Sequence, residues 1–175
     1  MEKLDKGGKC FERFVNDLEQ QKGLEPKIIA FQGKEGVKRA YLDEIEEGKT
    51  VYLLCGKIKK SEDVLKWFLE QFSKKRVKKG VKLKMLVSSK DKAIAEKYKL
   101  VEVHELFHEF PYPVTFAAYG NKFKIILWEN ELCGIIIEDK HIANFFKRIF
   151  KVLWCSCALH SLKTCIIKNL HGRKD

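Results

Sequence analysis

The sequence lacks long apolar runs. No stretch approaches the roughly 20 uninterrupted apolar residues of a membrane-spanning helix, and the N-terminal stretch M-E-K-L-D-K-G-G-K-C has no apolar middle region of a signal peptide. We therefore expect a cytoplasmic protein without a membrane partner. The 6 cysteines are scattered, and most lie in apolar runs where a reduced thiol packs as a small hydrophobic group, so no structural disulfide is expected.

Several familiar motifs are also missing. A Walker loop requires G-x-x-x-x-G-K-[ST] and a dinucleotide fingerprint requires G-x-G-x-x-G, whereas Gly33, Lys34, Glu35 and Gly36 form only G-K-E-G. No G-x-S-x-G elbow and no helix-turn-helix pair is present. Residues 33–36 therefore predict a turn before a helix, although the backbone N–H groups at such a helix start can also bind a polar ligand.

Two stretches contain potential metal ligands without a convincing zinc pattern. The tail C-S-C-A-L-H-S-L-K-T-C lacks paired C-x-x-C or H-x(3–5)-H spacing. His104, Glu105 and His108 match H-E-x-x-H as a string, which in zinc peptidases lies on a long helix. Because Pro111 and Pro113 prevent a helix from continuing, a metal-dependent hydrolase is only an alternative, and neither a metal nor a cofactor is expected.

What the sequence has in excess is positive charge. The formal net charge is +11, and the densest basic run is K-K-R-V-K-K-G-V-K-L-K at residues 74–84. The run can be the solvated C-terminal end of a helix, where cations are favoured, or a surface that binds nucleic acid. The candidate nucleic-acid contacts are Lys74, Lys75, Arg76, Lys78 and Lys79.

The apolar pattern predicts an α/β fold. Strands are expected at 27–31, 50–55, 81–87 and 100–103, alternating with helices at about 35–46, from Ser61 to Gly80, and near 91–98. Three strands in close succession follow, at 113–119, 122–128 and 132–138, and then a helix capped by Asp139. The order predicts a mixed sheet sandwiched by helices, which ends in an antiparallel meander and a C-terminal helix.

Four of these stretches resemble a known family. They are P-K-I-I-A-F-Q-G-K-E-G-V-K-R-A-Y (26–41), T-V-Y-L-L-C-G (50–56), P-V-T-F-A-A-Y-G-N-K-F-K-I-I-L-W (113–128) and G-I-I-I-E-D-K-H-I-A-N-F-F-K-R-I-F-K-V-L-W (134–154). Together they resemble the C-terminal effector domain of TrmB-family transcriptional regulators, a sugar-responsive group whose effector domain is similar to half of a phospholipase D. The resemblance implies a phospholipase D-like fold.

Phospholipase D enzymes carry H-x-K-x(4)-D before a hairpin, with the histidine as nucleophile. The three positions fall here on Tyr112, Val114 and Tyr119, and no H-x-K occurs elsewhere. The resemblance therefore implies a retained fold, a lost catalytic motif and a protein that is not an enzyme. It also implies binding of a small polar ligand such as a sugar.

Polarity and loop position indicate where such a ligand would bind. The candidate ligand-binding residues are Gly33, Lys34, Glu35, Gly36, Gly120, Asn121 and Glu129. The expected organisation is an N-terminal helix at 1–25 that is a remnant of a linker or coiled coil, an effector domain at 26–155, and a basic tail at 156–175. Because the helix from 140 onward carries more apolar positions than one sheet face requires, a homodimer is expected. The resemblance also implies a separate DNA-binding domain or protein. The alternative use of residues 142–170 is an amphipathic helix on a membrane.

Overall fold

The computed structural model describes residues 26–55, 57–106, 113–129 and 131–171. Its centre is a seven-stranded sheet in the order β1-β7-β6-β5-β2-β3-β4. The strands are β1 (Lys27–Gln32), β2 (Val51–Cys55), β3 (Leu83–Val87), β4 (Val101–Glu105), β5 (Val114–Tyr119), β6 (Lys122–Leu127) and β7 (Cys133–Glu138). The pairs β2·β3 and β3·β4 are parallel and the other four are antiparallel, so the sheet is mixed.

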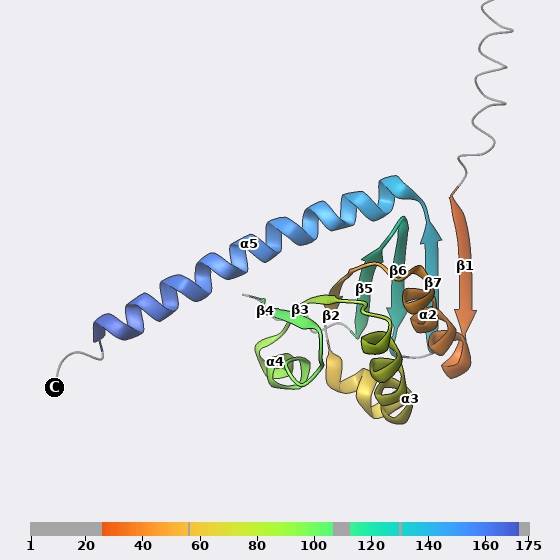
Figure 1. Ribbon diagram of the computed structural model, residues 1–175, viewed down its shortest axis with the longest axis horizontal. Helices are drawn as coiled ribbons and strands as arrows, with labels where there is room; N and C mark the ends of the chain where they lie inside the picture. The colour runs from red at the N-terminus through yellow and green to blue at the C-terminus, as the bar shows by residue number, and fades with distance from the viewer. Residues whose placement is uncertain (1–25, 56, 107–112, 130, 172–175) are drawn as a thin grey trace, which may run out of the picture.

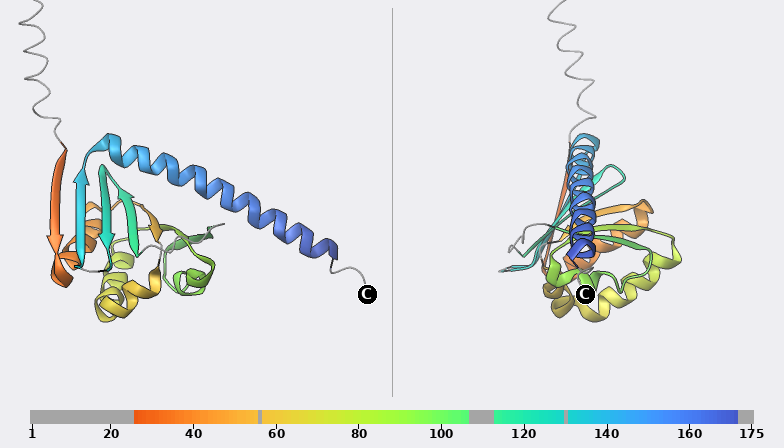
Figure 2. Two further views of the ribbon diagram at one scale, coloured as in Figure 1. Left: turned by 180° about the vertical axis from the view of Figure 1, so that it is seen from behind. Right: turned by 90° about the vertical axis from the view of Figure 1, so that its left-hand side faces the viewer.

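Helices cover both faces of this sheet (Figure 1). The helices are α2 (Gly33–Glu47), α3 (Ile58–Lys78), α4 (Ser89–Ala95) and α5 (Lys140–His171). Helices α2, α3 and α4 lie on one face, whereas α5 crosses the other face and continues past the sheet (Figure 2). The sandwich predicted from the sequence is therefore confirmed.

The core has one apolar layer on each side of the sheet. On the α2 and α3 side, Tyr41 packs edge-on against Phe72, and Trp128 from the end of β6 joins the same cluster. On the other side, Phe150 of α5 packs edge-on against Tyr52 of β2. The continuous apolar run of β2 is explained by its position inside the sheet, where both faces are covered.

Helices α3 and α5 each differ from expectation at one boundary, and the expected cap of α5 is confirmed. Helix α3 begins at Ile58 rather than at Ser61, whose hydroxyl instead donates to the Ile58 carbonyl inside the first turn, 2.6 Å away. Asp139 caps α5 as predicted, because its Oδ1 accepts from two backbone N–H groups at 2.8 Å. Helix α5 runs to His171, so the boundary expected at residue 156 falls within a helix. The helix predicted within residues 1–25 lies outside the described residues.

None of the helices in the part of the chain that the structure describes combines the length and apolarity needed to cross a bilayer.

Candidate functional site

A groove between α3 and α4 joins two separate basic segments of the chain. Its volume is about 660 Å³. It is lined by Glu62, Glu70, Ser73, Lys74, Val77, Lys78, Ile94, Lys97, Tyr98 and Lys99. Lys74 and Lys78 come from the basic run predicted as a candidate surface, whereas the sequence did not point to Lys97 and Lys99. Four lysines against two glutamates give the groove a positive lining.

The basic residues of this run have different environments. Lys74, Lys75, Lys78 and Lys79 are exposed, and of these only Lys74 and Lys78 line the groove. Arg76 is 0% exposed, so the prediction that it contacts nucleic acid is wrong. Its guanidinium points away from solvent because a helix places residue 76 on the opposite face from residues 74 and 78.

Arg76 instead holds one wall of the groove in place. Its Nη1 donates to the Val81 carbonyl and its Nη2 donates to the Lys99 carbonyl, both at 2.5 Å. These hydrogen bonds attach the end of α3 to the segment that bears Lys99. Removal of Arg76 would therefore change the groove through the position of this segment.

An exposed tryptophan extends the basic face of α3. Trp67 is 73% exposed, an unusual environment for the largest apolar side chain. Residues 67, 70, 74 and 78 are spaced by three and four, so they lie along one face of the helix. The helix is regular over this span, because its one non-helical residue, Leu65, comes earlier.

A smaller internal cavity lies between the helices and the sheet. Its volume is about 50 Å³, and Ser73 and Tyr98 contribute to the lining of both the cavity and the groove. Two polar atoms of the cavity-lining residues are buried without a hydrogen-bond partner among the described residues: Oε2 of Glu44 and Nε of Arg76. A buried acceptor and a buried donor are each costly to leave unpaired, so both favour a polar occupant.

Glu44 also forms a buried ion pair with Lys124 of β6. The Lys124 ammonium donates to Glu44 Oε1 and lies 4.0 Å from the centre of the Tyr41 ring. Burial raises the pKa of the Glu44 carboxyl, although Lys124 opposes the shift. Burial likewise lowers the pKa of Lys124 against the attraction of Glu44. Each partner therefore opposes the shift that burial causes in the pKa of the other.

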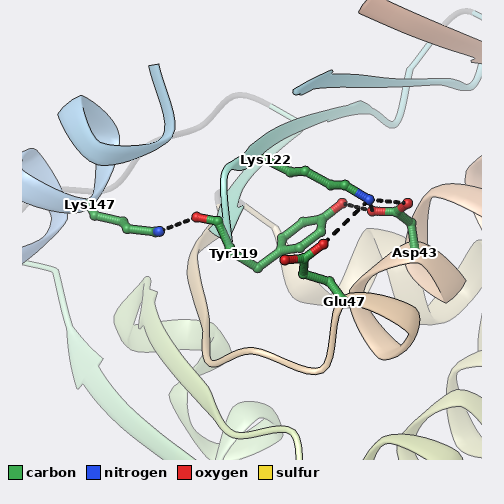
Figure 3. Close-up of polar contacts among 6 residues, drawn as sticks. Asp43, Glu47, Tyr119, Lys122 and Lys147 are labelled. Atoms are coloured by element: carbon green, nitrogen blue, oxygen red, sulfur yellow. Dashed lines mark hydrogen bonds and ion pairs between the residues drawn. The ribbon is translucent and has the colours of Figure 1, made fainter. Parts of the chain in front are cut away.

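A second polar cluster surrounds the β5–β6 hairpin (Figure 3). The Tyr119 hydroxyl donates to Asp43 Oδ2 at 2.9 Å, and Lys122 Nζ donates to both Asp43 oxygens at 2.8 and 3.1 Å. Glu47 Oε2 lies 3.6 Å from Lys122 Nζ, and Lys147 of α5 donates to the Gly120 carbonyl. Although partial burial opposes it, Asp43 raises the pKa of Lys122. The cluster connects α2, the hairpin and α5.

Tyr119 stands where the resemblance places the phospholipase D aspartate. Burial, and then the nearby carboxylates, raise the pKa of its hydroxyl, so this group is a hydrogen-bond donor at neutral pH. Val114 lies at the start of β5 and offers no titratable group, whereas Tyr112 lies outside the described residues.

The seven predicted ligand-binding residues do not form one site. Gln32 and Leu127 both pair with Cys133, so residues 33–36 and Glu129 lie at one end of the central strands. The turn residues Gly120 and Asn121 lie at the other end, where the Asn121 carbonyl accepts from Asp139 N at 2.9 Å. A shared role for the two groups in ligand binding stays a prediction.

The H-E-L-F-H string does not begin on a helix. His104 and Glu105 belong to β4, where successive side chains point to opposite faces, and His108 lies outside the described residues. The His104 ring stacks on Trp154 at 3.9 Å between centres, and its Nδ1 lies 3.2 Å from the Trp154 carbonyl oxygen. His104 and Glu105 therefore lack the helical arrangement on which the peptidase alternative depends.

Comparisons with known proteins identify the fold. No family model matches the chain, and no curated protein matches it. Among solved structures, NucT from Helicobacter pylori has a TM-score of 0.55 and 12% identity over 76% of this chain and 98% of that chain. Nuc from Salmonella typhimurium, a phospholipase D family member, has a TM-score of 0.53 and 12% identity over 74% and 95%. TrmBL2, an archaeal chromatin protein, has a TM-score of 0.52 and 18% identity over 87% of this chain and 62% of that chain.

These comparisons correct the expectation that the chain is not an enzyme. That expectation follows from the missing H-x-K-x(4)-D motif alone. NucT and Nuc, the latter a phospholipase D family member, share the fold, so the missing motif does not establish that catalysis is absent. The likeness to TrmBL2 and to Nuc together shows that the chain has a phospholipase D-like fold of the kind found in a TrmB-like protein.

Proposed function

We propose that this chain is a TrmB-type regulatory domain that binds nucleic acid in the groove between α3 and α4. The observation that carries the proposal is the convergence of Lys74, Lys78, Lys97 and Lys99 on one groove from two segments. Ammonium groups in such a cluster bind backbone phosphates and release condensed counterions, which supplies most of the affinity of sequence-independent binding.

The exposed side chain of Trp67 favours single-stranded or distorted nucleic acid, rather than an intact duplex, as the ligand of the groove. An exposed indole beside a basic track can stack on an unpaired base, and stacking tolerates any base because each has an aromatic face. Trp67 lies on the helical face that carries Lys74 and Lys78. TrmBL2, which has the same fold, shows a novel mode of DNA binding, and that property of a structural neighbour agrees with the proposal.

Fluorescence anisotropy with labelled single-stranded and double-stranded DNA tests the proposed groove. At low salt, the Lys74→Glu, Lys78→Glu double variant should bind at least about tenfold more weakly than the wild type, because two phosphate contacts become repulsions. The matched control is the Lys27→Glu, Lys49→Glu double variant, which changes the net charge equally at exposed positions outside the groove. If the two double variants lost the same amount of DNA affinity, binding in the groove between α3 and α4 would be contradicted.

A second candidate function is the sensing of a small polar ligand, which the unpaired atoms of Glu44 and Arg76 favour. The cavity of about 50 Å³ has room for one or two waters, since each water occupies about 30 Å³ in the liquid. A sugar would therefore enter only if Tyr98 or Ser73, which lie between cavity and groove, moved aside.

A thermal-shift screen with sugars and sugar phosphates tests this second function. A ligand of the cavity should raise the melting temperature of the wild type. Glu44→Gln, compared with its own ligand-free melting temperature because the substitution also destabilises the fold, should show a smaller rise since a carboxylate acceptor is lost. A shift that Glu44→Gln leaves unchanged would assign the ligand to another site.

A further inference from the structure

One of the carboxylates that line the groove, Glu70, lies among its lysines. Glu70 lines the groove together with Lys74 and Lys78, and its side chain is exposed. Glu62, the other carboxylate of the lining, accepts a hydrogen bond from the Tyr98 hydroxyl at 2.9 Å. Within the residues that the structure describes, the Glu70 carboxylate has neither a hydrogen bond nor an ion pair. Both of its oxygens are therefore open to a ligand of the groove.

The chemistry of a carboxylate limits what Glu70 can recognise in a nucleic acid. An ionised carboxylate only accepts hydrogen bonds and repels a backbone phosphate, so it cannot replace a lysine as a phosphate contact. In DNA, the groups that donate hydrogen bonds are the N–H groups on the edges of the bases. A favourable contact of Glu70 is therefore one with a base edge, and this role rests on the proposed function of the groove.

Glu70 lies one helical turn from the exposed ring of Trp67. Residues three apart on a helix have Cβ atoms about 5–6 Å from each other, and α3 is regular between residues 67 and 70. The Trp67 side chain is 73% exposed, which leaves its indole open to a base. A base that stacks on this ring presents its hydrogen-bonding edge within reach of the Glu70 carboxylate. Stacking and edge recognition thus act on the same nucleotide.

We propose that Glu70 selects guanine at the position that stacks on Trp67. Guanine carries two neighbouring donors on its Watson–Crick edge, N1–H and the 2-amino group, and their spacing matches the two oxygens of a carboxylate. Cytosine and adenine place their amino group beside a ring nitrogen that accepts hydrogen bonds and repels a carboxylate. Thymine has its N3–H between two carbonyl oxygens. Guanine is therefore the base with which Glu70 forms a pair of charge-assisted hydrogen bonds.

Fluorescence anisotropy with short oligodeoxythymidines that carry either one guanine or one hypoxanthine tests this selection. The two bases have the same fused rings and differ only in the 2-amino group, so they stack alike. At low salt, the wild type should bind the guanine oligonucleotide at least about fivefold more tightly, the discrimination expected of a bidentate contact. Glu70→Gln should reduce this ratio to about twofold or less, because the amide keeps only one acceptor oxygen.

The same substitution separates base recognition from general electrostatics. Because Glu70→Gln removes a negative charge beside the phosphates, it should also strengthen binding of the hypoxanthine oligonucleotide. The matched control is Asp63→Asn, which removes one negative charge at an exposed position of α3 outside the groove lining. Asp63 precedes Trp67 by four residues, and its variant should keep the guanine preference of the wild type. Circular dichroism should show both variants folded, since both residues are exposed.

Three results would overturn the selection of guanine by Glu70. The first is equal affinity of the wild type for the two oligonucleotides, which would leave nucleic-acid binding by the groove in place without base selection. The second is a gain in Glu70→Gln that is equal for both oligonucleotides, which would make Glu70 a general electrostatic residue. The third is loss of the guanine preference in Asp63→Asn. Failure of the wild type to bind either oligonucleotide would contradict the proposed function itself, and with it the role of Glu70.

Discussion

At the scale of single residues, the interior contains charged side chains whose burial the sequence pattern does not predict. Lys124 alternates with apolar residues in K-F-K-I-I-L, a pattern that normally places a lysine in solvent. In the structure it is 0% exposed because Glu44, distant in sequence, meets it across the α2–β6 interface. No local pattern could have revealed this pair, since both partners look like ordinary surface charges on their own elements.

Loss of Glu44 should therefore destabilise the fold strongly. Glu44→Gln leaves the Lys124 ammonium buried without a counter-charge, and such changes lower the free energy of unfolding by about 3–5 kcal/mol. Urea denaturation measures the effect. The matched control is Glu102→Gln, which removes the carboxylate from the exposed Lys84–Glu102 pair and should change stability by about 1 kcal/mol or less. Similar small losses in both variants would show that the buried pair contributes little.

The thiol of Cys55 should be nearly inert. Burial raises its pKa to about 11, although the hydrogen bond with Thr115 opposes the shift. At pH 8 only about one thiol in a thousand is then ionised, and reactivity requires the thiolate. Iodoacetamide labelling followed by peptide mass spectrometry should modify the exposed Cys155 rapidly and Cys55 only on unfolding. Equal labelling rates for Cys55 and Cys155 in the native protein would contradict the burial of the Cys55 thiol.

At the scale of elements, the sequence predicts which segments form helices and strands far better than it predicts their neighbours. The G-K-E-G turn predicts a helix start, and α2 does begin at Gly33, where φ is +70°. The buried contact of Gly36 with β1 has no signal in the local sequence. A Cβ at position 36 would lie 2.8 Å from the Cβ of Phe31, which only glycine avoids.

Gly36→Ala should therefore cost more than Gly33→Ala. The added methyl at position 36 meets backbone atoms of Phe31 as well as its Cβ, and overpacking of this kind costs about 1–3 kcal/mol. At position 33 no atom lies within 4 Å of the added Cβ, so only the strain of a positive φ, about 1–2 kcal/mol, applies. Thermal or urea unfolding of the two variants gives the order. A larger loss at position 33 would mean that β1 moves easily away from α2.

Trp67 on helix α3 allows the contribution of base stacking to be tested separately from that of the lysine charges. Trp67→Ala should weaken binding of single-stranded DNA by about 1–3 kcal/mol, the cost of losing one stacked base, and should change duplex binding less. Anisotropy titrations measure both affinities. Because Trp67 is exposed, the substitution should leave the circular dichroism spectrum unchanged. Equal affinity of variant and wild type for single strands would remove Trp67 from the interface.

At the scale of the whole molecule, chain order and sheet order differ in a way that the sequence does not reveal. The strand at 27–31 precedes the strand at 50–55 and looks like its neighbour, yet β1 lies at the sheet edge and pairs with β7. The groove likewise depends on the tertiary structure. Lys74 and Lys99 are separated in the chain by β3 and α4, and the fold brings both of them to the lining of one groove. Charge density predicts the α3 half of the candidate site, whereas the other half requires the tertiary structure.

The net charge of +11 attracts any polyanion, so affinity alone does not identify the groove. The most direct measurement is the salt dependence of single-stranded DNA binding by the wild type and by the Lys74→Gln, Lys78→Gln double variant. If both lysines contact phosphates, the slope of log Kobs against log salt should become shallower by about 1.4, since each lost contact removes about 0.7. A slope that is the same in both proteins, or a wild type that does not bind at low salt, would contradict nucleic-acid binding in the groove between α3 and α4.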